Sequence, residues 1–441
     1  MLKMKKTMLV IIKLACVCLV VRPEFTNAKP GLPDIQPSNY RVNSLKNANF
    51  LMDTSPEAVS RISQIDMTIT NTADKYSFDD VVECNWDDQV LPSGQTPKFH
   101  CLVRQADGTS GKSIKVKFSP LRDDNGANVP DPYGEVFTTV LSSRLLRALG
   151  FGTNDLYLVK TLRCYGCSKD PWSDSIWLYG PNSTPLSRYV FKSQHSNYKE
   201  SGRDDDGNIE YVLDTSQYTE FTYVSIQKKV GFEIQSFEGQ GIGYDEFSNV
   251  NPANHAALDA FRLLSVFLNH ADNKASNQAL TCMDTTEDIL EELKNISSPS
   301  DSYSCKNPII IIKDAGKEFG SGAYGLLTQY RALDLDDPNE GGGGWKQAKI
   351  WQNDDNCMVD IHGSPFNSSF HPVVISEEGR QLLAHRLNQL TSQQIGDLFK
   401  GVKVSELPFS GHPEFKDVQN WVKVFMEKRD EINSRTCPIS N

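Results

Sequence analysis

The sequence predicts an α+β protein, with a β-rich first half built around one main helix and a helical second half. Two patterns support this fold class. Short runs of alternating residues, separated by turn-forming residues, fill positions 81–118 and are typical of strands. Residues 255–270 are apolar on almost every side of a helix, which indicates a helix at the centre of a folded unit.

The N-terminus is patterned as a secretory signal peptide. The basic start MLKMKK is followed by the short apolar run MLVIIKLACVCLVV and by the segment TNA, which ends at Ala28. The run is too short to span a bilayer comfortably, although an uncleaved anchor is the alternative. We therefore expect residues 1–28 to be removed near Ala28, giving a secreted or periplasmic protein without a stable membrane anchor.

Charge and cysteine content narrow the class of protein. Without residues 1–28 the chain has 40 Lys and Arg against 55 Asp and Glu, a net charge of −15. Such an acidic surface argues against nucleic acid or an anionic membrane as a partner. Eight of the ten cysteines remain, an even number that predicts disulfide bonds but leaves 105 pairings open. Cys164 and Cys167 have the spacing of a redox motif, but we favour a small structural loop because no histidine or second such pair supports a metal site.

The elements of the first half follow in chain order. Residues 29–75 are polar and irregular, and predict an N-terminal extension with at most a surface helix. The runs VVECNW, KFHCLVRQ and SIKVKF predict three strands, and the segment from Glu135 to Gly150 predicts an amphipathic helix. NDLYLVKTLRC and FTYVSIQKKV predict two more strands, and we expect no regular structure between these two.

The second half begins with the apolar helix at 255–270. The short runs ALTC and PIIII predict strands, and a long insertion separates them. SEEGRQLLAHRLNQL and TSQQIGDLF then predict consecutive helices. Thr391 and Gln394 form a capping box at the start of the second of these helices.

Two polar segments imitate binding motifs but lack the required context. Residues 106–113, ADGTSGKS, have the loose pattern of a phosphate-binding loop. A phosphate-binding loop is followed by a helix, whereas the next residues, IKVKF, alternate as a strand, so we predict a hairpin turn. Residues 203–208, RDDDGN, lack the full spacing of a calcium loop and also predict a hydrated hairpin turn.

One polar segment, HADNKASNQ, has the spacing of a catalytic loop. Its fixed positions are His270, Asp272, Lys274 and Asn277, a combination expected by chance in about one chain per thousand of this length. Spacing alone leaves a solvated loop as the alternative. The position in the chain favours catalysis, because the apolar helix precedes the segment and a buried strand further on leads to Asp314–Ala315–Gly316.

This order of a buried helix, H-x-D-x-K-x-x-N, two short strands and D-x-G resembles the core of the protein-kinase-like superfamily, in particular its atypical secreted and exported members. The resemblance implies a two-lobed fold and gives each residue a role. Asp272 would accept the hydroxyl proton of the phosphate acceptor, and Lys274 would face the transferred phosphoryl group. Asn277 and Asp314 would bind Mg²⁺ or Mn²⁺, and His270 would brace the loop.

The same resemblance implies a lysine on a strand and a glutamate on the next helix. Lys117 and Glu135, 18 residues apart, fit these positions, and Lys115 on the same strand face is the fallback. A surface lysine and a helix-start glutamate are the alternative reading of these two residues. No G-x-G-x-x-G lies between the first strands, so either residues 93–98 or the DGTSG turn must cover the nucleotide. We favour Gly94 and Lys98, because they lie between the first two strands.

Two further features of the resemblance concern the D-x-G region. Ala315 stands where most such kinases have phenylalanine, and no A-P-E segment follows, so peptide recognition of the ordinary kind is not supported. Cys282 and Cys305 bracket the insertion between the two short strands. We predict that they form a disulfide bond that closes this charged loop.

We therefore expect a disulfide-bonded phosphotransferase that uses ATP and Mg²⁺ or Mn²⁺. The β-rich lobe would span residues 76–235, the helical lobe 236–400, and a tail at 401–441 would pack on the helical lobe. A pseudokinase, a small-molecule or sugar kinase, and an exported binding protein without catalysis are the alternatives. The acceptor, the oligomeric state and the choice between phosphoryl and adenylyl transfer stay open.

Overall fold

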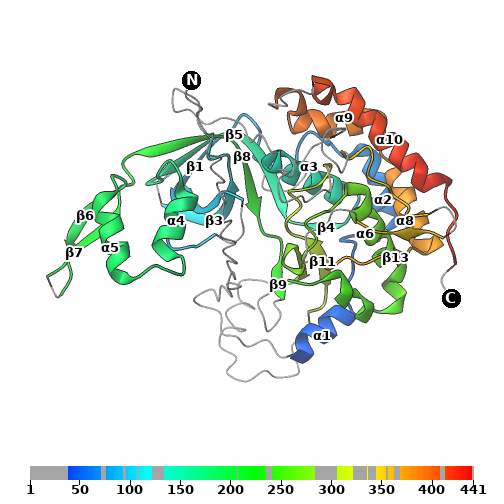
Figure 1. The fold of residues 1–441 in the computed structure, drawn as a ribbon, viewed down its shortest axis with the longest axis horizontal. Coiled ribbons are helices and arrows are strands. Elements are labelled where there is room, and N and C mark those ends of the chain that lie inside the picture. The colour runs from blue at the N-terminus through cyan, green and yellow to red at the C-terminus, as the bar shows by residue number, and fades with distance from the viewer. Residues whose placement is uncertain are drawn as a thin grey trace, which may run out of the picture.

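The computed structural model describes residues 38–70, 76–92, 96–105, 107, 109–121, 134–205, 207–234, 241–283, 305–320, 335, 344–353, 356–361, 368–407 and 413–439. A β-barrel with a projecting arm lies beside a larger part in which helices surround a small sheet (Figure 1). The predicted α+β class is confirmed. The predicted signal peptide and its cleavage position at Ala28 lie outside the described residues.

Five strands close the barrel in the order β1, β2, β3, β8 and β5. Their bounds are Val81–Trp86, Lys98–Arg104, Ser110–Lys117, Tyr218–Lys228 and Asp155–Tyr165. All neighbours are antiparallel except β1 and β5. Phe99, Phe118 and Phe221 fill the interior, with ring centroids 5.1 to 5.5 Å apart. Each of the five strands was predicted, and the rejected phosphate-loop segment leads into β3 and not into a helix, as expected.

The arm is an insertion between β5 and β8, and its prediction as irregular chain was wrong. It contains α4 (Pro171–Tyr179), α5 (Pro185–Gln194) and the hairpin of β6 (Tyr198–Arg203) and β7 (Ile209–Leu213). Both helices begin with a side-chain cap, from Asp170 and Thr184, followed by proline. No residue of α5 is buried, and its apolar residues are at most partly covered, as Phe191 is where it packs against the barrel core.

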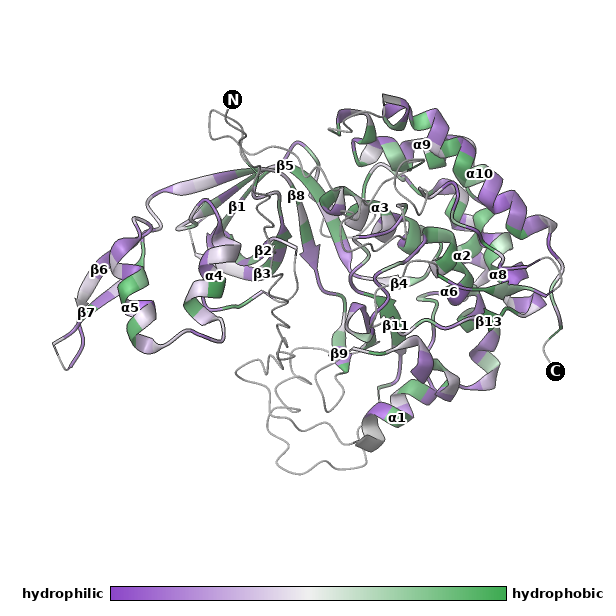
Figure 2. Ribbon diagram, in the orientation of Figure 1, coloured by the Kyte–Doolittle hydropathy of each residue, from purple (hydrophilic) through white to green (hydrophobic). Residues whose placement is uncertain are grey.

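The helical part surrounds a sheet with the order β4, β11, β10 and β9. Its strands are Gly152–Thr153, Pro308–Ile312, Gln278–Cys282 and Phe232–Ile234. The helices are α3 (Glu135–Ala148), α6 (His255–Leu268), α8 (Glu377–Leu387), α9 (Ser392–Gly401) and α10 (Val418–Ser434), and a short pair of strands, β12 (Met358–Val359) and β13 (Val373–Val374), lies nearby. Hydrophobic residues concentrate on β11 and α6 at the centre of this part (Figure 2).

The segment 38–70 differs from its predicted role as part of a surface extension. It contains α1 (Ser38–Lys46) and α2 (Pro56–Arg61), and its chain runs into the core of the helical part. The ring of Phe50 lies 5.4 Å from Phe247 and 5.2 Å from Phe261, centroid to centroid. The polar composition concealed this contribution, because a few buried side chains carry the packing.

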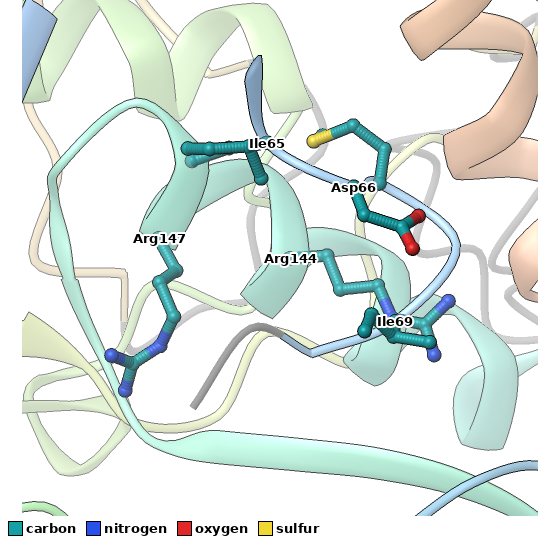
Figure 3. A pocket seen from close by; sticks show the side chains of 7 residues that line it. Ile65, Asp66, Ile69, Arg144 and Arg147 are labelled. Carbon is teal, nitrogen blue, oxygen red and sulfur yellow. The ribbon is translucent and has the colours of Figure 1, made fainter. Parts of the chain in front are cut away.

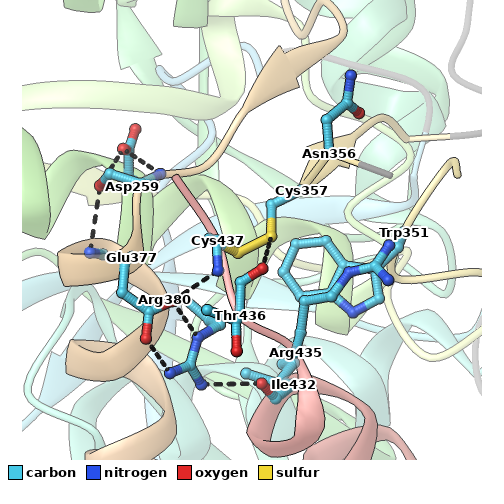
Figure 4. The surroundings of a disulfide bond; sticks show 12 residues. Asp259, Trp351, Asn356, Cys357, Glu377, Arg380, Ile432, Arg435, Thr436 and Cys437 are labelled. Carbon is cyan, nitrogen blue, oxygen red and sulfur yellow. Dashed lines mark hydrogen bonds and ion pairs between the residues drawn. A yellow bond between two sulfur atoms is a disulfide. The ribbon is translucent and has the colours of Figure 1, made fainter. Parts of the chain in front are cut away.

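The predicted C-terminal tail contains the helix α10, which packs on α8 and α9. The capping box of Thr391 and Gln394 is confirmed at the start of α9. A disulfide between Cys357 and Cys437 fixes the chain after α10, and the carboxylate of Glu377 accepts a hydrogen bond from the Cys437 amide at 2.7 Å (Figure 4).

Four disulfides use the eight cysteines outside residues 1–28. The predicted bond between Cys282 and Cys305 is confirmed, and the remaining three bonds are Cys84–Cys101, Cys164–Cys167 and Cys357–Cys437. Within the described residues, no helix combines the length and apolar character needed to cross a membrane.

Candidate functional site

A buried ion trio forms where the barrel meets the helical part. The Nζ atom of Lys117, the last residue of β3, lies 3.0 Å from Glu135 Oε1 and 2.7 Å from Asp314 Oδ1. The side chain of Lys117 is 2% exposed. Burial would lower its pKa, but the two carboxylates outweigh burial and raise the pKa above its usual range. Lys117 is therefore a permanent cation, and the predicted contact with Glu135 is present.

Local structure brings Glu135 to this lysine. Gly134, with a φ of 74°, turns the chain in a left-handed conformation immediately before α3. Glu135 follows in the first turn, where the helix dipole favours a carboxylate. Its Oε1 atom also accepts a hydrogen bond from Thr96 Oγ1 at 2.6 Å. Thr96 was not among the predicted site residues.

Asp314 enters the site two residues after β11 ends. Its side chain is 25% exposed, so it is open on one side. Burial alone would raise its pKa, but Lys117, Lys98 and Lys115 hold the pKa well below its usual range. Asp314 is thus an anion at any physiological pH.

Gly316 lies directly against the ion trio. A Cβ atom at this position would be 2.7 Å from Glu135 Cγ and 3.0 Å from Lys117 Nζ. Only a glycine permits so close an approach of the backbone. The D-A-G turn is consequently in contact with both residues that the sequence placed in the first half.

The polar loop that follows α6 lies beside Asp314. Asn269, with a φ of 53°, caps α6 in a left-handed conformation and turns the chain into the loop. At the other end, the Asn277 carbonyl accepts hydrogen bonds from the amides of Lys313 at 2.9 Å and Asp314 at 3.3 Å. The Asn277 side-chain nitrogen donates to the Asp272 carbonyl at 2.6 Å. The predicted metal ligands, Asn277 and Asp314, are therefore neighbours.

Asp272 lies between two ammonium groups. Lys274 Nζ is 3.3 Å from one of its carboxylate oxygens, and Lys317 Nζ is 3.9 Å from the other. The Asp272 side chain is 18% exposed. These contacts keep the carboxylate at the opening of the site and orient it. Lys317 was not identified from the sequence.

His270 is buried and joins two other buried groups. Its Nδ1 atom lies 2.6 Å from Glu318 Oε1, and its Nε2 atom lies 2.8 Å from the side-chain nitrogen of Gln278. Both His270 and Glu318 are 0% exposed. Burial raises the pKa of Glu318, an effect that His270 partly offsets. This chain links the D-A-G segment to the polar loop, and only His270 was predicted.

Asn273, between Asp272 and Lys274, anchors the loop to a distant segment. Its Oδ1 atom accepts hydrogen bonds from Ser368 Oγ at 2.6 Å and from the amides of Ser369 and Phe370 at 3.1 and 3.2 Å. Its side-chain nitrogen donates to the His270 carbonyl at 3.1 Å. No local pattern indicates this role, because the partners lie 95 to 97 residues away.

Two more lysines border the ion trio. Lys98 is the first residue of β2 and the direct cross-strand neighbour of Lys117. Lys115 lies two residues before Lys117, on the same face of β3. Burial lowers the pKa of Lys98 and lowers that of Lys115 to about 7, although Asp314 opposes both shifts. Gly94, the other residue assigned to the nucleotide, lies outside the described residues.

Two hollows elsewhere in the molecule are separate from these residues. One, of about 170 Å³, is lined by Arg144 and Arg147 of α3 and by residues 65–67 and Ile69 (Figure 3). The other, of about 340 Å³, lies between α6, α8 and the N-terminal segment. Neither is lined by a residue of the ion trio or of the polar loop, so convergence of charge, rather than a deep cavity, identifies the candidate site.

The described residues contain no group of three or more His, Cys, Asp or Glu side chains that could hold a metal ion. A site with one carboxylate and one amide can still bind Mg²⁺ when phosphate oxygens and water supply the other ligands. Asp314 and Asn277 provide that donor set.

Comparison with known proteins assigns no family to the chain, because no family model, curated protein or solved structure matches it.

Proposed function

We propose that the protein is an ATP- and divalent-metal-dependent phosphotransferase with a protein-kinase-like two-lobed architecture. The single observation that carries the proposal is the contact of Lys117 with both Glu135 and Asp314. A lysine held by a helix glutamate beside a metal-binding aspartate is the arrangement with which protein kinases hold ATP phosphates. The sequence pattern of the polar loop then supplies the remaining parts.

Each group has a role that its position supports. Lys117 would bind phosphate oxygens, and Glu135 would keep its ammonium aimed at them. Asp272, at the opening of the site, would accept the proton of the acceptor hydroxyl, while Lys274 neutralises charge on the group being transferred. His270, with no exposed surface, would hold the loop rather than touch a substrate.

The residues present fit a hard divalent cation, because Asp314 and Asn277 offer oxygen donors from adjacent strand ends. When bound, the cation would neutralise negative charge on the phosphate chain. Asp314 is the anion closest to the Lys117 ammonium, and it would exchange that contact for the cation. The lysine would then be released towards the phosphates.

A non-catalytic nucleotide-binding scaffold is the second candidate. The observation in its favour is that the ammonium groups of Lys274 and Lys317, at 3.3 and 3.9 Å, already engage the Asp272 carboxylate before any acceptor hydroxyl is bound. Both candidates bind nucleotide, and only phosphate transfer separates them.

The test combines binding with transfer. ATP with Mg²⁺ or Mn²⁺ should raise the thermal unfolding midpoint of the wild type, and Asp314→Asn should abolish the metal-dependent part. Asp430→Asn, an exposed site on α10, is the matched control and should behave as wild type. Asp272→Asn should keep binding but reduce transfer of labelled phosphate by about 10²–10⁴-fold. No shift in the wild type with either metal would contradict both candidates, and binding without transfer would leave the scaffold.

A further inference from the structure

The face of the β2–β3 hairpin that meets Asp314 carries three lysines. Lys98 and Lys117 are directly opposite each other in the register of the two strands, and Lys115 lies on the same face. Like charges directly opposite across two strands are destabilising. This face therefore lowers the stability of the free protein unless an anion occupies it.

The acids inside the site do not balance these charges. Glu135 and Asp314 are both bound to Lys117. In the described part of the chain, the ammonium group of neither Lys98 nor Lys115 is within ion-pair distance of an acid or donates a hydrogen bond. Lys98 is nevertheless only 5% exposed, and an unpaired buried ammonium is costly.

The excess of positive charge is confined to this face and contrasts with the net negative charge of the whole chain. The whole chain has a net charge of −11, yet Asp314 is surrounded by Lys98, Lys115 and Lys117. Lys98 also lies near enough to Lys274 of the polar loop for the two charges to interact. The positive region thus continues across the site, from the hairpin to the loop that carries Asp272.

We propose that Lys98 and Lys115 form a second phosphate-binding pair, which makes the site selective for a triphosphate over a diphosphate. The proposal extends the proposed function to the choice of phosphate donor. A nucleoside triphosphate bound to one divalent cation keeps about two negative charges, whereas a diphosphate keeps about one. Two unpaired ammonium groups balance the two negative charges of the metal-bound triphosphate. Their charge also attracts an inorganic triphosphate without metal.

The experiment measures the affinity of ATP and ADP with Mg²⁺, and of inorganic triphosphate in a metal chelator, by calorimetric titration. The wild type should prefer ATP to ADP by tenfold or more and should bind inorganic triphosphate. Lys98→Gln and Lys115→Gln should each lower the affinity for ATP about tenfold and the affinity for ADP much less. The preference for ATP over ADP should therefore become smaller. Lys112→Gln removes the same charge from an exposed position of β3 and should change neither affinity.

The unfolding midpoint without ligand provides a second readout. Lys98→Gln and Lys115→Gln should leave it equal or higher, because each removes a repulsive charge, whereas a purely structural lysine would lower it. An unchanged ATP preference in both variants, or no binding of inorganic triphosphate to the wild type, overturns the proposal. Lysine-dependent triphosphate binding without phosphate transfer would refute the phosphotransferase function and keep the phosphate-binding pair. Phosphate transfer with an unchanged preference for ATP over ADP would support the phosphotransferase function and refute the phosphate-binding pair.

Discussion

The ammonium of Lys117 lies 2.7 Å from the carboxylate of Asp314, although 197 residues separate them in the sequence. Because Lys117 also holds Glu135, one cation joins β3, α3 and the segment after β11. The barrel and the helical part therefore share a polar contact at the candidate site, and each side of the contact depends on the other.

Removal of this cation should destabilise the protein. Lys117→Met leaves two carboxylates without their partner, which for a buried pair costs about 3–5 kcal/mol; we expect the lower end, because Asp314 is 25% exposed and Lys98 and Lys115 remain nearby. Denaturant unfolding of Lys117→Met, Asp314→Asn and the double variant measures the coupling. The double variant should lose less than the sum of the single losses. Strictly additive losses would contradict a direct interaction.

The same contact sets the response to acid. The folded-state pKa of Asp314 is lowered from its ordinary value of 3.8, so the stability it contributes is present above that value and is lost as the pH falls through the folded-state pKa. In Lys117→Met the folded-state pKa moves back up. Unfolding free energies measured below pH 3.8 should therefore fall less steeply in this variant than in the wild type.

Gly316→Ala tests the packing of the D-A-G turn against the ion trio. The new Cβ would lie 2.7 Å from Glu135 Cγ, so the glutamate must move away from Lys117. We expect a loss of about 1–3 kcal/mol in unfolding free energy, together with weaker nucleotide binding. Gly396→Ala on α9 is the control, since its Cβ would be 3.7 Å from Val422 and the helix should gain about 0.5–1 kcal/mol. Equal behaviour of the two variants would show that the close approach has no consequence.

The fold was predictable where local pattern and burial agree. Apolar and polar residues alternate along the barrel strands, as expected for strands with one buried face. The helix α6 is apolar on almost every side, and it is buried by the surrounding protein. The arm was not predictable, because α5 buries no residue and its caps alone did not suffice. The segment with Phe50 was missed for the opposite reason: its polar composition hides an aromatic ring that packs among distant ones.

The same distinction separates the predicted site residues from the missed ones. Lys117, Glu135 and Asp314 lie at or near the ends of predictable elements and belong to a recognisable spacing, so the sequence located them. Glu318 and Asn273 act through partners 48 to 97 residues away. No spacing rule identifies such residues, since the chain between the partners can have any length.

Glu318 offers a test of the buried chain behind the polar loop. Glu318→Ala removes the group that accepts the hydrogen bond from His270 Nδ1, in surroundings where neither residue is exposed. An unsatisfied buried donor costs about 1–3 kcal/mol, and the loop that carries Asp272 should lose its fixed position. We expect phosphate transfer to fall more than ATP affinity, and the ¹⁵N shifts of His270 to report a changed tautomer. Glu318→Gln should restore part of the transfer, and an unchanged His270 spectrum in Glu318→Ala would contradict the role.

Lys115 should make triphosphate binding depend on pH above neutrality. Its pKa of about 7 reflects burial together with the charges of Lys117, Lys98 and Lys229, opposed by Asp314. As the pH rises through this value the ammonium loses its charge, and the affinity for a triphosphate should fall by up to tenfold per pH unit.

Stability should change in the opposite direction over the same range. The unfolded chain holds the Lys115 proton up to its ordinary pKa of 10.5, so the unfolded state binds more protons between about pH 7 and 10.5 and the contribution of Lys115 to unfolding free energy rises with pH. Calorimetric titrations of inorganic triphosphate between pH 7 and 9, on the wild type and on Lys115→Gln, separate the effect of Lys115 from the last ionisation of the ligand, which affects both proteins alike. The affinity of the wild type should fall relative to that of Lys115→Gln over this range. A ratio of the two affinities that does not change with pH would mean that Lys115 does not face the bound phosphates.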